Sequence, residues 1–176
     1  MDRQEYVILV DGEDQQIGTA EKLEAHRAGA LHRAFSIVIW NSERRMLLQQ
    51  RALGKYHSPG LWTNTCCGHP RPNEVVSDAA TRRLAEEMGF TCTLSPLGTI
   101  SYRAEFSNGL IEHEIVHVYR GLHNGAVAPN PEEAANCAWR TLDEVRHDIA
   151  AAPDTYSVWF RQYVAAEWPT AMTPPE

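Results

Sequence analysis

Two pairs of side chains in this sequence have the types and the spacing of a reaction centre. Glu112 and Glu114 stand two residues apart, and so do Cys67 and His69. Side chains alternate between the two faces of a β-strand, so each pair shares one face if its segment is extended, while His113 points away. Carboxylates, imidazoles and a thiol can hold divalent metals and move protons. The two pairs therefore indicate acid–base or metal chemistry.

A second set of charged side chains lies on a predicted helix. Apolar residues recur at three- and four-residue steps across residues 74–88, and Gly89 is well placed to end the helix. Arg83 and Glu87 lie one helical turn apart. A carboxylate at that position can hold Mg²⁺, a hard cation that prefers oxygen ligands and phosphate partners. An ordinary ion pair on a solvated helix face fits the same spacing.

Strands and helices alternate around these residues. We expect strands at residues 6–10, 34–40, 45–51, 97–106, 110–119 and near 137–140, and helices at 20–28, 74–88, from 142, and at about 157–167. Asn108-Gly109 is a strong hairpin signal, and residues 41–44 are expected to join a second hairpin. Frequent hairpins among helices predict an α+β fold with a mixed sheet between helices.

Composition favours one globular domain. The 176 residues, 43% hydrophobic and 22% charged, suit a single core, expected over residues 1–168, with 169–176 as a frayed, proline-rich tail. The net charge of −7 argues against nucleic acid as a partner, because phosphate backbones attract clustered Lys and Arg. We find neither a signal peptide nor an apolar run long enough for a membrane, so we expect a cytoplasmic protein without a membrane partner.

The stretch GHPRPNEVVSDAATRRLAEEMGF, which begins at Gly68, resembles the Nudix box. That pattern is Gly, five residues, Glu, seven residues, Arg-Glu, an aliphatic, one residue, Glu-Glu, one residue, Gly and an aliphatic. The positions that match are Gly68, Glu74, Arg82, Leu84, Glu86, Glu87, Gly89 and Phe90. Arg83 stands where the box has a glutamate. A cation there should weaken a cluster of water-activating metals and favour gripping a diphosphate, which weighs against pyrophosphohydrolysis.

The surrounding sequence resembles one branch of that superfamily, the type 1 isopentenyl diphosphate isomerase family. WTNTCCGHP at residues 62–70 matches its W-T-N-x-x-C-G-H-P stretch. Further matches are LHRAFS, QQRALGKYHSPGLW, YRAEF, IEHEIVHVY and YSVWF, so the resemblance runs from about residue 6 to 165. It implies a Nudix fold with an N-terminal strand and helix extension. It also implies a monomeric enzyme of isoprenoid biosynthesis that interconverts isopentenyl diphosphate and dimethylallyl diphosphate, a small-molecule substrate pair.

The resemblance implies two metal sites. It assigns three histidines and two glutamates to one of them: His26, His32, His69, Glu112 and Glu114. Imidazole plus carboxylate suits Mn²⁺, Zn²⁺ or Fe²⁺ and does not identify the metal. The second ion is Mg²⁺, held with the diphosphate by Glu87 and by the main-chain carbonyl of Cys67. A core or surface role is the commoner one for a single histidine, but five matches in motif positions favour the metal site.

The resemblance gives the acid–base work to Cys67 and Glu114. Moving an unactivated double bond requires a proton delivered to one face and another removed from the neighbouring carbon. Which of the two residues protonates first stays open. Tyr102 is expected to relay or orient the proton, and Trp159 to stabilise a tertiary carbocation with its ring face, although core packing is the alternative for this tryptophan. Cys66 should point the other way in an extended stretch and has no catalytic role.

The family's cationic grip on the diphosphate corresponds here to four residues: Lys22, Arg51, Lys55 and Arg83. Two other functions stay open. A Nudix pyrophosphohydrolase acting on a nucleoside diphosphate derivative explains the box, but not residues 62–70 or the extra histidines. A non-catalytic ligand-sensing module would keep the fold. Loss of catalysis usually removes catalytic groups, however, and here Cys67, Glu114 and Tyr102 are all present.

Overall fold

Nine strands and four α-helices form along residues 5–166 and 172–174, the part of the chain that this computed structural model describes. The strands are β1 Tyr6–Val10, β2 Gln16–Glu21, β3 His32–Trp40, β4 Met46–Arg51, β5 Trp62–Thr63, β6 Cys66–Gly68, β7 Leu94–Glu105, β8 Ile111–Leu122 and β9 Ala134–Arg140. The helices are α1 Lys22–Ala28, α2 Val76–Met88, α3 Leu142–Ala151 and α4 Val158–Ala165, with a 3₁₀ turn at Pro153–Thr155. No helix among these residues is long and apolar enough to cross a membrane.

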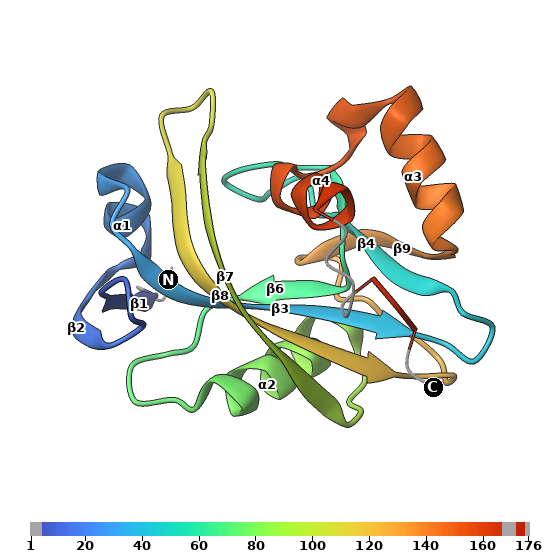
Figure 1. The fold of residues 1–176 in the computed structure, drawn as a ribbon, viewed down its shortest axis with the longest axis horizontal. Helices are drawn as coiled ribbons and strands as arrows, with labels where there is room; N and C mark the ends of the chain where they lie inside the picture. The colour runs from blue at the N-terminus through green and yellow to red at the C-terminus, as the bar shows by residue number, and fades with distance from the viewer. Residues whose placement is uncertain (1–4, 167–171, 175–176) are drawn as a thin grey trace.

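One mixed sheet holds the nine strands, with α2 against one face and α3 and α4 on the other side (Figure 1). The predicted α+β class is therefore confirmed. Seven of the nine residues of β3 are hydrophobic or small and almost fully buried, because both sheet faces are covered. Phe35, Ile37 and Ile39 pack toward α2, whereas Val38 and Trp40 belong to the core that contains α4.

The centre of the sheet is the parallel pair of β3 and β8. Their register runs from His32 opposite Glu114 to Trp40 opposite Leu122. The β7–β8 hairpin predicted from Asn108-Gly109 is present, and its strands are longer than expected. Register and alternation together place the even-numbered side chains of β3 and β8 on the α4 face of the sheet.

The second predicted hairpin is only partly correct. β3 and β4 pair through a single position, Trp40 opposite Met46, and then diverge. Residues 63–68 enter between them. Thr65 Oγ1 accepts from the Ile39 amide at 2.9 Å and donates to the Leu47 carbonyl at 2.7 Å. A side chain thus replaces part of the backbone ladder that would have closed the hairpin, and the sheet opens where β6 enters it.

The N-terminal extension contains a strand that the sequence analysis did not predict. β2 pairs with β1, and α1 begins at residue 22 rather than 20. The side chain of Glu21 accepts from the amides of Leu23 and Glu24, so it caps the helix and sets where it begins. α1 therefore presents Lys22 and His26, four residues apart, on one face.

The predicted tail is described only in part, since residues 169–171 and 175–176 lie outside the described residues. Met172 is 5% exposed and belongs to the core beside α4. The carbonyl of Thr173 accepts from Arg120 at 2.9 Å. Met172 and Thr173 are therefore packed on the domain.

Replacing Gly89 by alanine should destabilise the domain by more than about 2 kcal/mol, because two costs add. Gly89 ends α2 with φ +76°, and an added Cβ would lie 2.5 Å from the carbonyl oxygen of Ala128. Left-handed backbone alone costs about 1–2 kcal/mol. Urea unfolding would measure the change in free energy.

Substitutions at two other glycines measure the backbone cost separately from the cost of the steric contact. Gly109 has φ +82° with open space around it, so Gly109→Ala should cost only the backbone term. Gly12 has open space and ordinary φ, so Gly12→Ala should change stability by less than about 0.5 kcal/mol. Equal losses for Gly89→Ala and Gly109→Ala would show that the contact with Ala128 contributes nothing.

Candidate active site

One cavity of about 350 Å³ collects most of the residues singled out from the sequence. The predicted site residues that line it are Lys22, Arg51, Lys55, Cys67, His69, Arg83, Glu87, Tyr102, Glu112, Glu114 and Trp159. His26 and His32 are fully buried and contact the cavity residues Glu112 and Glu114. The lining comes from both sides of the sheet, α2 on one and α4 on the other, at the place where β3 and β4 diverge.

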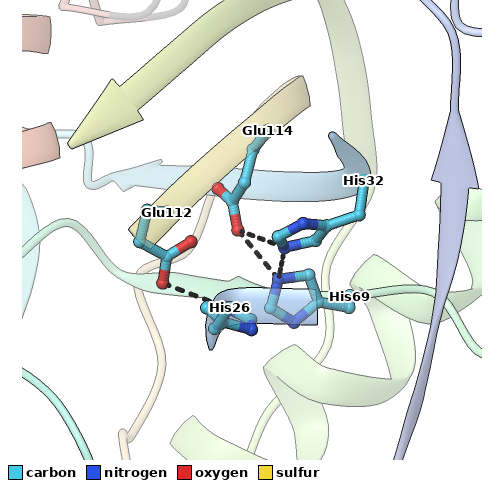
Figure 2. A group of neighbouring side chains, drawn as sticks. All are labelled: His26, His32, His69, Glu112 and Glu114. Atoms are coloured by element: carbon cyan, nitrogen blue, oxygen red, sulfur yellow. Dashed lines mark hydrogen bonds and ion pairs between the residues drawn. The ribbon is translucent and has the colours of Figure 1, made fainter. Parts of the chain in front are cut away.

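The three histidines and two glutamates converge at one point (Figure 2). One ligand atom from each residue lies within 4.8 Å of those of the other four. The parallel register puts His32 beside Glu114, and His69, just after β6, reaches Glu114 Oε1 with its Nε2 at 2.8 Å. His26 arrives from α1 and lies 3.3 Å from Glu112 Oε1. His113 faces away, as alternation predicts, and its Nδ1 contacts the Gly29 carbonyl.

Hydrogen bonds select one tautomer of two of these histidines. Nδ1 of His26 lies 2.6 Å from the Lys22 carbonyl, and Nδ1 of His32 lies 2.8 Å from the Ala30 carbonyl. A carbonyl only accepts, so Nδ1 carries the proton in both neutral rings and Nε2 keeps its lone pair. Metal-ligating histidines are commonly oriented in this way by the nitrogen that does not bind the metal.

The Nε2 lone pairs of His26 and His32 are directed at the other members of the cluster. Nε2 of His32 lies 3.2 Å from Nε2 of His69 and 3.4 Å from Glu114 Oε1. Nε2 of His26 and Oε2 of Glu112 are buried and have no hydrogen-bond partner among the described residues. A divalent cation would satisfy these lone pairs together, so the residues fit such an ion. Imidazole with carboxylate does not select among Mn²⁺, Fe²⁺ and Zn²⁺.

Burial and the neighbouring charges shift the titration of this cluster. Burial, reinforced by the charge of Glu112, raises the pKa of Glu114 to about 7. Burial also acts to raise the pKa of Glu112, but its contacts with His26 and His57 outweigh that effect and lower it well below the usual range. Two adjacent carboxyls with opposite shifts can play different parts in proton transfer.

Cys67 presents its thiol to the cavity from β6. Its Sγ lies 3.3 Å from Asn64 Oδ1, which accepts the S–H, and 3.4 Å from Ser36 Oγ. Burial raises the pKa of Cys67 to about 12 despite its hydrogen bonds with these two residues, so the thiol is protonated at neutral pH. Cys66 is fully buried in the core beside α2, which confirms that it points the other way.

Tyr102 and Trp159 stand near these groups. Tyr102 is opposite Glu114 in the β7–β8 register, and burial raises the pKa of its hydroxyl, which has no hydrogen-bond partner in the described part of the chain. Trp159 belongs to the α4 core, as the packing alternative predicts, and it also lines the cavity, while its role toward a carbocation stays a prediction. The guanidinium carbon of Arg51 lies 5.3 Å from the centroid of its ring.

All four predicted diphosphate-binding cations line the cavity, and each has an acceptor partner. The pairs are Lys22 with Glu5 at 2.7 Å, Lys55 with Glu133, Arg83 with Glu87 at 2.5 Å and with Glu133 at 3.1 Å, and Arg51 with the carbonyls of His57 at 3.0 Å and Ser58 at 3.2 Å. Arg83 and Glu87 do form the pair expected one helical turn apart. An anionic ligand would therefore replace carboxylates that already hold Lys22, Lys55 and Arg83.

Two residues without a predicted role also belong to the network of charged side chains around the cavity. His57 contacts Glu112. Glu133, in an unpredicted turn just before β9, joins Lys55 to Arg83. Both stand in irregular segments, where no periodicity indicates which way a side chain points. The sequence signal nearest to His57 is its position two residues after Lys55, in the segment KYHSPG at residues 55–60.

The fold and the site define a member of the NUDIX class. The NUDIX domain family matches residues 30–162. A similar fold occurs in DR0079 of Deinococcus radiodurans, with a TM-score of 0.70 and 20% identity over 84% of this chain and 90% of that one. The MutT protein of Methanosarcina mazei has a TM-score of 0.65 and 19% identity over 80% of this chain and 94% of that one.

Curated relatives identify the family within the NUDIX class. The isopentenyl-diphosphate Delta-isomerase of Burkholderia multivorans is 54% identical over 157 residues, which cover 89% of each chain. That of Pectobacterium atrosepticum is 48% identical and covers 88% of this chain and 87% of its own. This chain belongs to the isopentenyl-diphosphate Delta-isomerase family, and the resemblance drawn from its motifs is confirmed.

Alkylation of Cys67 by iodoacetamide should be slow at neutral pH and should rise about tenfold per pH unit between pH 7 and 10. The pKa of about 12 leaves only a trace of thiolate in that range, and the thiolate is the reacting species. Peptide mass spectrometry would follow Cys67 separately from Cys92 and Cys137. A rate that levels off below pH 9 would mean that the site lowers this pKa instead of raising it.

Proposed function

We propose that the chain interconverts isopentenyl diphosphate and dimethylallyl diphosphate by protonation and deprotonation through a tertiary carbocation. One observation carries this proposal. The protonated thiol of Cys67 and the carboxyl of Glu114 line the same cavity as four cationic side chains. An acid–base pair serves a double-bond shift, and the cations serve a diphosphate.

The two proton-transfer groups are set apart along the sheet. Cys67 pairs with Ser36 and Glu114 pairs with His32, which lies four residues earlier on β3. Four residues are an even number, and β6 and β8 flank β3, so both side chains emerge on the same face of the sheet, on either side of β3. A short hydrocarbon chain lying between them meets one group at each of two carbons. One group gives a proton to the alkene while the other takes one, so the protein's total proton count is unchanged.

Neighbouring residues hold these two groups in their reactive forms. Asn64 and Ser36 fix the direction of the Cys67 S–H. The Tyr102 hydroxyl, buried beside Glu114, orients or relays the proton. The ring of Trp159 offers its quadrupole to positive charge that develops on the hydrocarbon.

The chain's own residues also account for the metals that its family resemblance implies. His26, His32, His69, Glu112 and Glu114 would hold Mn²⁺ or a similar divalent ion, and Glu87 would hold Mg²⁺ together with the diphosphate. When bound, such ions supply positive charge that adjusts the acidity of Glu114 and neutralises the phosphates. Lys22, Arg51, Lys55 and Arg83 anchor the diphosphate and leave the hydrocarbon end at Cys67 and Glu114.

Pure protein incubated with isopentenyl diphosphate in deuterated buffer should place solvent deuterium in the C4 methyl group of the product, as followed by proton NMR. Cys67→Ala should lower this turnover at least about 100-fold, the usual contribution of a general acid or base. Cys66→Ala is the matched control, because the adjacent thiol lies in the core on the other side of β6. Circular dichroism would show that both variants fold.

The same protein should release no orthophosphate from a panel of nucleoside diphosphate derivatives. Phosphate release from the panel with unchanged isopentenyl diphosphate would replace the isomerase by a pyrophosphohydrolase. Full isomerisation by Cys67→Ala would leave the proposed reaction in place but show that the thiol takes no part in it.

Glu87→Gln should raise the Mg²⁺ concentration for half-maximal turnover at least about tenfold, because it removes the carboxylate proposed to bind this ion. Glu86→Gln is the control, since Glu86 contacts the same Arg83 at 2.8 Å but its side chain is 40% exposed. A Mg²⁺ titration of turnover for the two variants and the wild type tests this. Identical titrations for all three would place the Mg²⁺ elsewhere.

A further inference from the structure

His57 is a buried histidine that directly contacts the His/Glu cluster but is not one of its five members. It lies in the segment between β4 and β5 and is 6% exposed. Its Nε2 lies 2.8 Å from Oε1 of Glu112, closer than the 3.3 Å of His26 Nε2 from the same oxygen. An ionised carboxylate only accepts, so Nε2 of His57 carries the proton and donates it to Glu112.

This hydrogen bond distinguishes the two oxygens of Glu112. Oε1 accepts from His57, whereas Oε2 is buried and has no hydrogen-bond partner in residues 5–166 and 172–174. Figure 2 shows one oxygen directed at His26 and the second turned away from it. The carboxylate is therefore held by one oxygen, and the other keeps its lone pairs for a ligand.

The ring of His57 has little freedom to turn away from Glu112. It stacks on Phe106 with centroids 5.0 Å apart and an interplanar angle of 16°. Trp159 and Tyr56 pack against it in T-shaped geometry, with ring centroids 5.7 Å and 4.6 Å away. The backbone is fixed too, because Arg51 donates to the carbonyl of His57.

We propose that His57 is a positioning residue for the metal site, in that its Nε2–H fixes the Glu112 carboxylate with Oε2 free to bind the divalent ion. The inference rests on the proposed function, which places that ion at the five residues of the cluster. Partners of this kind typically change metal affinity 10–100-fold. The ring also joins the metal site to Trp159, so one residue sets the position of a ligand and packs against the aromatic wall of the cavity.

Two substitutions separate the donor from the ring. His57→Phe keeps the stacking on Phe106 and removes the N–H. His57→Gln removes the ring and returns an N–H donor at similar reach. His147→Phe, at an exposed position of α3, is the matched control for loss of a histidine. Each protein would be stripped with a chelator and titrated with Mn²⁺, with free Mn²⁺ followed by electron paramagnetic resonance and folding checked by thermal unfolding without metal.

We expect His57→Phe to weaken Mn²⁺ binding about tenfold or more, His57→Gln to stay within about threefold of the wild type, and His147→Phe to match it. Equal affinity in wild type and His57→Phe would overturn the positioning role, as would equal losses in the Phe and Gln variants. If wild type itself binds no Mn²⁺, the metal site of the proposed function fails, a result distinct from either. Should His57→Phe not fold, the Gln variant and His57→Asn, whose shorter side chain cannot reach Glu112, decide the question in the same titration.

Discussion

The parallel pairing of β3 with β8 is the constraint on which the site depends. It places His32 opposite Glu114 and brings two strands that are about eighty residues apart in sequence into contact along nine positions. Parallel neighbours cannot be joined by a tight turn, so the intervening chain must leave the sheet and return. In this protein that intervening chain supplies β6, α2 and β7, and with them Cys67, Glu87 and Tyr102. The connection that the topology requires is thus the source of most of the site.

The opening between β3 and β4 gives these residues their common cavity. A regular hairpin would have filled the space with backbone hydrogen bonds. Instead the side chains of Asn64 and Thr65 take those bonds, as when Asn64 Nδ2 donates to the Ile37 carbonyl at 2.9 Å. Buried polar side chains are costly unless all their hydrogen bonds are made, and these are. Asn64 and Thr65, in the stretch before His69, therefore have a structural role in opening the sheet.

Charge is arranged in two opposite ways within the cavity. Around the histidines, Nε2 of His26 and Oε2 of Glu112 are buried acceptors without a hydrogen-bond partner among the described residues, and a divalent cation would satisfy them. Among the cationic side chains of the cavity, by contrast, Lys55 and Arg83 are already paired with Glu133 and Glu87. A diphosphate with bound Mg²⁺ carries both negative and positive charge. Its phosphates would pair with Arg83, and the Mg²⁺ would pair with the carboxylates displaced from Arg83. The proposed diphosphate site is therefore compatible with a net charge of −7.

The sequence alone determined the class of fold, the family, and the alternation that sets Cys67 apart from Cys66 and Glu112 and Glu114 apart from His113. These are local properties, because motif spacing and strand periodicity do not depend on distant partners. It also placed α2 and the β7–β8 hairpin within a few residues. It was wrong about the full β3–β4 hairpin, because pairing was decided by residues 63–68 that enter from elsewhere. Only the tertiary structure decided that His57 meets Glu112 and that Glu133 joins two cations, since irregular segments have no period and their side chains are directed by contacts with chain far away in sequence.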